Sequence, residues 1–348
     1  MASTTKVDIE QTVRDILATI DKDREKEIIS RRFGLFDRKE TLEQIGELLG
    51  ITRERVRQLE KAVLIKLKAS AKSNKLSHLN EVQSILKEAI NDRGGITRIT
   101  ELSAYLTEKN TRVDQSQVSF LALLSNDLVV VEENDDFYQA AGIKAMHDEA
   151  KIKELVSKII DAVKKIGEQA PIEKIAKQAG PDFGTQQTRA LASISKHLAS
   201  LNGQWGLVKW PTVNPKNIRD KIYVILKENG KPLHFNEIAA AIKKSDFKRK
   251  DVTTQAIHNE LIKDKRFILI GRGIYALKEW GYEKGTVADI IASVLKTAEK
   301  PLHRDEIIKQ VLKSRFVKET TILLNLQGKS QFKRVAKATY ALDDSVSN

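Results

Sequence analysis

A repeated segment limits the folds that this chain can adopt. The tetrapeptide Lys-Pro-Leu-His occurs at residues 231–234 and again at residues 300–303. Before each copy, at residues 218–228 and 287–298, apolar side chains recur at the spacing of an amphipathic helix. The two copies therefore belong to two similar units, and this part of the chain is expected to form small domains in series.

Each unit continues with the same order of predicted elements. A second amphipathic helix follows the tetrapeptide, a third helix begins some ten residues later, and alternating apolar residues then predict a β-hairpin. Three helices and a hairpin predict a winged helix. The second helices are expected at residues 235–242 and 304–312, the third helices from about residues 250–254 and 318–321, and the hairpins at residues 267–277 and 332–342.

Two earlier stretches fit the same pattern less closely. A helix at residues 82–90 leads to apolar wing segments at residues 128–131 and 137–138, and a helix at residues 152–166 leads to the segment 205–210. Four units therefore follow the first 72 residues, with turn-rich linkers between them. The expected domains are residues 1–72, 78–142, 149–212, 215–281 and 285–344, and the linkers are residues 70–77, 142–149, 211–215 and 281–285.

Residues 41–60 predict a helix-turn-helix. Thr41 caps a short amphipathic helix, Gly50 can adopt the left-handed conformation that ends it, and Thr52 caps the next helix. Apolar residues at helical spacing, among them Ile45 and Val56, face a small common core. The second helix is therefore expected to present a polar face to solvent.

That polar face carries Arg53, Glu54, Arg57 and Gln58. In the major groove of DNA, Arg pairs with guanine, Gln with adenine, and Glu with the cytosine amino group. Solvated side chains that pair with one another along an exposed helix would have the same composition. Either role is compatible with this face taken alone.

The longer run around this face resembles a known family. Residues 23–35, 41–46 and 52–60 follow one another as in region 4 of bacterial sigma-70 family RNA polymerase sigma factors. The resemblance covers about residues 20–70. It implies a helix-turn-helix domain within residues 1–72. Together with the tandem winged-helix domains and short β-hairpin wings that the repeated pattern predicts, the expected fold is mainly α.

The resemblance also implies roles for particular residues. The second helix would read promoter −35 DNA, and the earlier helices would contact the flap of the RNA polymerase β subunit. Ile28, Phe33, Leu35 and Phe36 would line the core or the flap-facing surface. Core is the expected role, because so small a domain has few other apolar residues to bury. By resemblance, the base contacts would be Arg53, Glu54, Arg57 and Gln58, and the phosphate contacts Arg31, Arg32, Thr52 and Lys61.

The net charge of +13 suggests a polyanionic partner, although surface lysines that confer solubility would give the same total. Residues 213–348 carry 27 basic and 16 acidic groups, whereas residues 74–212 carry 17 and 18. The basicity therefore belongs to the last two units. Further phosphate contacts are expected there from Lys248, Arg249 and Lys250 before the third helix of the third unit, and from Arg272 on its wing; Lys333, Arg334 and Lys337 lie on the last wing.

The third unit resembles a second family. Its ending, residues 266–280, is similar to the HARE-type winged helix at the N-terminus of the RNA polymerase δ subunit of Gram-positive bacteria, and residues 205–210 are similar to it too. The acidic tail of that subunit has no counterpart here. Trp205, Trp210 and Trp280 are expected to pack on the domain cores, although an aromatic wing residue can also stack on bases.

Several classes of protein are not expected. The chain has no cysteine, its six histidines lack paired spacing, and we find neither a glycine-rich phosphate loop nor a nucleophile–base pattern. We therefore expect no enzyme activity, metal or cofactor. With no apolar signal core at its start and no membrane-length apolar stretch, the chain is expected in the bacterial cytoplasm, associated with the nucleoid.

Two functions follow from these features. The first is a transcription regulator that binds promoter DNA with its sigma-like module and associates with RNA polymerase. Because the aromatic helix with which sigma factors melt the −10 element has no counterpart, independent promoter opening is not expected. The second is a DNA-binding repressor or chromosome-organising protein that never contacts polymerase.

Overall fold

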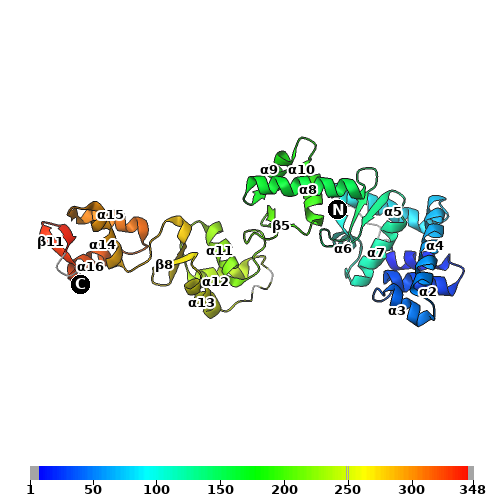
Figure 1. Ribbon diagram of the computed structural model, residues 1–348, viewed down its shortest axis with the longest axis horizontal. Coiled ribbons are helices and arrows are strands. Elements are labelled where there is room, and N and C mark those ends of the chain that lie inside the picture. The colour runs from blue at the N-terminus through cyan, green and yellow to red at the C-terminus, as the bar shows by residue number, and fades with distance from the viewer. Residues whose placement is uncertain (1–7, 248, 250, 344–348) are drawn as a thin grey trace. The chain divides into compact units, whose positions relative to one another are not determined.

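A computed structural model describes residues 8–343 except residues 248 and 250, and it confirms the expected mainly helical fold. The chain divides into two compact units, Met1–Lys209 and Trp210–Asn348 (Figure 1). In the part of the chain that is described, each unit holds two three-stranded antiparallel sheets. Among the same residues, no helix is both long and apolar enough to cross a membrane.

The first unit begins with four helices, which we call the N-terminal module. They are α1 (Ile9–Ala18), α2 (Asp23–Phe33), α3 (Leu42–Leu49) and α4 (Arg53–Lys72). The Asp8 side chain caps α1 by accepting a hydrogen bond from the Gln11 amide, 2.9 Å away. Helix α2 ends at Gly34, whose φ of 63° lies in the left-handed region that favours glycine.

Four segments after α4 share one order of elements, namely helix, short strand, two helices and a hairpin; we call them repeats 1 to 4. Repeat 1 consists of α5 (Ser77–Asn91), β1 (Ile96–Arg98), α6 (Ile99–Leu106), α7 (Arg112–Leu124), β2 (Leu128–Val131) and β3 (Ala140–Ile143). Repeat 2 consists of α8 (Glu149–Ile166), β4 (Ala170–Pro171), α9 (Ile172–Ala179), α10 (Thr185–Ile194), β5 (Leu198–Leu201) and β6 (Gln204–Leu207).

The second unit holds repeats 3 and 4. Repeat 3 consists of α11 (Ile218–Asn229), β7 (Leu233–His234), α12 (Phe235–Lys244), α13 (Thr254–Lys263), β8 (Phe267–Gly271) and β9 (Ile274–Leu277), followed by a short helix η1 (Lys278–Trp280). Repeat 4 consists of α14 (Val287–Ala298), β10 (Leu302–His303), α15 (Arg304–Ser314), α16 (Glu319–Gly328), β11 (Phe332–Ala336) and β12 (Thr339–Leu342). In every repeat the short strand pairs with the last strand of the hairpin.

The Lys-Pro-Leu-His tetrapeptides form part of this sheet, which the sequence did not predict. Leu233 pairs with Tyr275, and Leu302 pairs with Tyr340. In each tetrapeptide the histidine also caps the next helix, because Nδ1 of His234 or His303 accepts a backbone hydrogen bond at 3.3 Å. The tetrapeptide recurs because it both closes the sheet and starts a helix.

The wing of repeat 1 differs from the prediction. Its second strand is β3, not the segment 137–138. Phe137 instead forms a bridge with Ser195 of repeat 2, and the Tyr138 amide donates to the Ile194 carbonyl oxygen at 2.9 Å. Apolar character alone could not distinguish a strand of this hairpin from a segment that pairs with another repeat.

The N-terminal module and repeat 1 share one hydrophobic core. Buried side chains of α1, α2 and α4 pack with those of α5 and α7 in a single cluster. The rings of Phe33 and Phe120 lie 5.1 Å apart, and Nε2 of Gln117 donates to the Leu35 carbonyl oxygen at 2.7 Å. The predicted linker at residues 70–77 is itself held in this core by Ala71 and Leu76, so these two parts are continuous.

Some predicted core aromatics are not fully buried. Ile28 and Leu35 are buried and Phe33 is half-buried, but Phe36 is 39% exposed, and the Arg14 guanidinium lies 4.6 Å from its ring centroid. The three tryptophans, Trp205, Trp210 and Trp280, are all half-buried. An arginine stacked on the open face of Phe36 explains why this ring tolerates solvent.

His147, between β3 and α8, predicts a pH-dependent stability. Its side chain is 1% exposed, and neither ring nitrogen has a hydrogen-bond partner in the described part of the chain. Burial, with a smaller contribution from Lys151, lowers the pKa of His147 below its ordinary value of 6.5. The folded state therefore binds fewer protons than the unfolded state as the pH falls below about 6.5.

The stability that neutral His147 contributes should be complete above pH 6.5 and be lost as the pH falls through the lower folded-state pKa. For one proton the slope is at most about 1.4 kcal/mol per pH unit. Hydrogen–deuterium exchange of peptides that cover His147, from pH 7.5 to 5, measures it. His147→Leu should flatten the profile, and an equally steep profile in that variant would assign the effect to other groups.

Candidate nucleic-acid interface

Local sequence fixes the turn between α3 and α4. Thr41 and Gln44 form a capping box at the start of α3, with hydrogen bonds of 3.2 and 2.9 Å. Gly50, with φ 64°, ends α3, and the Ile51 amide donates to the Gly46 carbonyl oxygen at 3.0 Å. Thr52 then caps α4 by accepting from the Arg55 amide at 3.2 Å. The predicted helix-turn-helix is confirmed at these residues.

A small core supports the turn. Ile28, Ile45 and Val56 are fully buried together, and half-buried Leu42, Leu49, Ile51 and Leu59 pack around them. Because these apolar residues occupy one side of each helix, the first turns of α4 project the opposite side to solvent. This small core fixes the start of α4, and the later turns of α4 pack in the core shared with repeat 1.

All four predicted base-contacting residues are exposed on that side of α4. Arg57 binds Glu54 through two hydrogen bonds, of 2.8 and 2.7 Å, and Gln58 Nε2 donates to the same carboxylate at 3.4 Å. Arg53 lies nearer α3, where its Nη1 is 3.9 Å from Oε1 of Glu43. The structure therefore brings Glu54, Arg57 and Gln58 into one hydrogen-bonded group.

The Arg57–Glu54 pair also shifts the ionisation of both groups. Its hydrogen bonds raise the pKa of Arg57 and lower the pKa of Glu54, so both are charged at neutral pH. A guanine edge would have to replace Glu54 as the bidentate acceptor of Arg57. Release of Glu54 would in turn free a carboxylate to accept from cytosine.

Arg55 is a further residue of this face that was not predicted from the sequence. This side chain is exposed, and its Nη1 donates to Oε1 of Gln58 at 3.3 Å. It belongs to the same polar surface, because residues three apart on a helix are neighbours. That spacing was the signal that could have identified Arg55.

The predicted phosphate-contacting arginines of α2 are held in ion pairs. Arg31 contacts Glu27 and Glu40, each at 2.9 Å, and these carboxylates raise its pKa. Arg32 lies 3.5 Å from Glu60 of α4. Both side chains are half-buried and link α2 to its neighbours. Their availability to phosphate is correspondingly lower than that of exposed Lys61.

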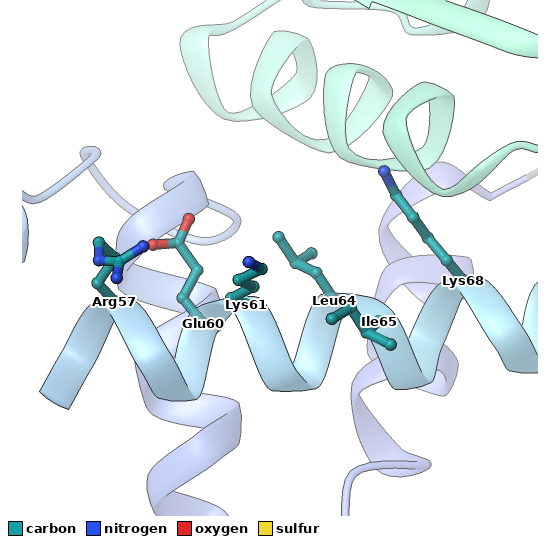
Figure 2. Close-up of a pocket in the computed structure, with 6 residues that line it drawn as sticks. All are labelled: Arg57, Glu60, Lys61, Leu64, Ile65 and Lys68. Carbon is teal, nitrogen blue, oxygen red and sulfur yellow. The ribbon is translucent and has the colours of Figure 1, made fainter. Parts of the chain in front are cut away.

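An open groove of about 320 Å³ continues from the reading face along α4. Figure 2 shows its lining side chains projecting along the length of this one helix. Three cationic, one acidic and two apolar side chains line it, and the apolar Ile65 is 59% exposed. The lining residues are Arg57, Glu60, Lys61, Leu64, Ile65 and Lys68.

The C-terminal cations lie in the second compact unit. Lys248 and Lys250 fall outside the described residues. Arg249 is exposed, with φ 54°, and its carbonyl oxygen accepts from Nζ of Lys221 at 2.7 Å. Arg272 is exposed between β8 and β9, and Lys333, Arg334 and Lys337 are exposed on the wing of repeat 4.

The segment that carries the exposed polar face of α4 is similar to a known family. Residues 22–69 match the family model of sigma-70, region 4. Region 4 is a DNA-binding helix-turn-helix domain, so the match supports a DNA-binding, transcription-related role and confirms the sigma resemblance of this segment. The region-4 segment contains α2 and α3 and all but the end of α4, and it ends before repeat 1 begins.

Proposed function

We propose that the protein is a DNA-binding transcription regulator that acts in initiation and reads promoter −35-like DNA with α4. The observation that carries this proposal is the exposed polar group of Glu54, Arg57 and Gln58 on the first turns of a capped helix, inside the region-4 segment. Arg53 would extend the reading face, and Thr52 and Lys61, both exposed, are proposed to contact phosphates.

The four repeats are proposed to be winged-helix domains. Each has the order of a winged helix, with the short strand and the hairpin forming one small sheet beside three helices. Their proposed bounds are residues 78–142, 149–212, 215–281 and 285–344, and repeat 3 is proposed to be of the HARE type. In repeat 3, Arg249 and Arg272, with Lys248 and Lys250, supply sequence-independent phosphate contacts.

Arg57→Ala tests the reading face. We expect a loss of about 1–3 kcal/mol in binding to the preferred duplex and a much smaller loss with random DNA, because a bidentate base contact is removed. Fluorescence anisotropy of both duplexes over a range of salt concentrations measures this difference.

Lys61→Ala provides the matched control on the same helix. It should weaken all sequences about equally and reduce the slope of log K against log salt by about one. Equal losses on the two duplexes with Arg57→Ala would leave only a phosphate contact at that residue, and the proposed reading face would be wrong.

RNA polymerase, through its β flap, is the proposed protein partner in the bacterial nucleoid. The apolar sides of α1 and α2 are already buried beneath α5 and α7. A flap contact would therefore use the exposed residues of these helices or require α7 to move. Pull-down of core polymerase by the intact chain tests this partner.

The same burial favours the second candidate, a repressor or chromosome-organising protein that binds DNA without polymerase. If the intact chain retains sequence-specific DNA binding but captures neither core polymerase nor its isolated flap, this second function is the correct one. Genome-wide occupancy at most promoters would instead support the first.

A further inference from the structure

The third helices of the four repeats, α7, α10, α13 and α16, differ in what covers them. In repeat 1 this helix is α7, which is buried on several sides. Even its polar residues Ser116, Gln117 and Ser119 are covered, and Gln117 donates to the carbonyl oxygen of Leu35. The N-terminal module therefore occupies the face of α7.

The third helix of repeat 2, α10, packs against β1 of repeat 1. Gln186 donates to the Asp92 carbonyl oxygen, and the carbonyl oxygen of Ser193 accepts from Arg98. The approach is so close that a Cβ at Gly94 would lie 2.7 Å from the carbonyl oxygen of Gln186. Repeat 1 thus covers α10, and both third helices of the first unit serve to hold it together.

In repeat 3 the equivalent helix, α13, has an open face. Its buried residues are Ile257 and Leu261, which point into the repeat's own core. Gln255 and Asn259 are exposed one turn apart, joined by a hydrogen bond of 3.1 Å, and Ile262 on the same side is 64% exposed. Side chains at this spacing form one continuous stripe.

The chemistry of this stripe matches an A·T base-pair edge. Asn and Gln amides bind adenine N6 and N7 in the major groove, and apolar side chains contact the thymine methyl group. Helix α16 of repeat 4 is open too, but Thr320 and Leu324 stand where α13 has Gln255 and Asn259. Leu324 is 68% exposed and offers no hydrogen bond to a base.

Exposed cations border the α13 stripe. Arg249 precedes the helix, and Lys263 and Lys265 lie at its end. Two nearby acidic groups are neutralised within the repeat, since Glu260 lies 3.8 Å from Arg219 and Asp264 lies 2.8 Å from Arg266. Asp246 and Asp251 are exposed. Residues 213–348 nevertheless carry 27 basic and only 16 acidic groups, which favours binding of a polyanion.

We propose that α13 is a second base-reading helix, which recognises A·T pairs in duplex DNA through Gln255 and Asn259. The protein would then read two separate DNA elements, one with each compact unit. This builds on the proposal that the chain binds DNA, but α4 and α13 can be inactivated separately. Linking two such sites in one chain raises overall affinity through effective concentration.

Selection from a library of random duplexes tests the proposal with the intact protein. Wild type should enrich two motifs, one of which is A·T-rich. Gln255→Ala with Asn259→Ala should remove the A·T-rich motif and lower affinity for it about 5- to 150-fold per lost bidentate contact. Arg57→Ala should remove the other motif. Thr320→Ala with Gln327→Ala, exposed on α16, is the matched control and should change neither.

A second variant reports a change of preference. Gln255→Glu replaces an amide with an acceptor-only group and should shift that position from adenine towards cytosine. The α13 proposal is overturned if no motif depends on Gln255 and Asn259, if all sequences weaken equally, or if only capture of a protein such as polymerase is lost. If Arg57→Ala leaves selection unchanged while the A·T-rich motif still depends on α13, the α4 proposal fails alone.

Discussion

Phe120→Ala is expected to lower the free energy of unfolding of the first compact unit by about 3–5 kcal/mol, the usual cost of removing a large ring from a packed core. Phe120 is fully buried on α7, and its ring lies 5.1 Å from that of Phe33 on α2. The cavity would therefore open between the N-terminal module and repeat 1. Denaturant titration of the intact chain measures the loss.

Hydrogen–deuterium exchange then shows where the loss falls. If the two parts share one core, protection should fall in α1 and α2 as well as in repeat 1. Phe36→Ala is a matched control. Because that ring is 39% exposed, its removal should lower the free energy of unfolding by about 1 kcal/mol or less. Unchanged protection of α1 and α2 in Phe120→Ala would show that the module and repeat 1 are independent.

The sequence predicted the helices whose apolar residues recur regularly, and α14 agrees at both ends with the expected residues 287–298. Thr286 and Asp289 form a capping box at its start, so local chemistry fixes that end. Strands β7 and β10 were missed because two residues are too few to show the alternation of a strand.

The burial of α7 could not be predicted from its own residues. Serines and a glutamine within this helix indicate a solvated side, yet Gln117 finds its acceptor at Leu35, which is far away in the sequence. The ion pair of Arg32 with Glu60 could not be predicted for the same reason, because Glu60 approaches Arg32 only when α2 packs on α4. By contrast, the exposed face of α4 was predictable, because helical periodicity within one short segment determines it.

Gly46→Ala is expected to destabilise the helix-turn-helix, although alanine is the better helix former. In a helix interior, exchanging Gly for Ala stabilises by about 0.5–1 kcal/mol. A Cβ at Gly46, however, would lie 2.7 Å from the backbone oxygen of Ile51, which has no freedom to move aside as a side chain would. We expect the cost of overpacking, about 1–3 kcal/mol, to exceed the gain in helix stability.

Relief of this close contact would displace Ile51 and so move α4 relative to α3, because the Ile51 amide is hydrogen-bonded to the Gly46 carbonyl oxygen. Gly46→Ala should therefore lose about 1–3 kcal/mol of DNA-binding free energy for each displaced base contact. Gly50→Ala separates stability from geometry, since a Cβ there meets nothing within 4 Å but φ 64° costs about 1–2 kcal/mol. Well below its melting temperature, Gly50→Ala should still select the preferred duplex. If Gly46→Ala melts higher than wild type and binds equally well, the turn tolerates a side chain and the close contact does not set the position of α4.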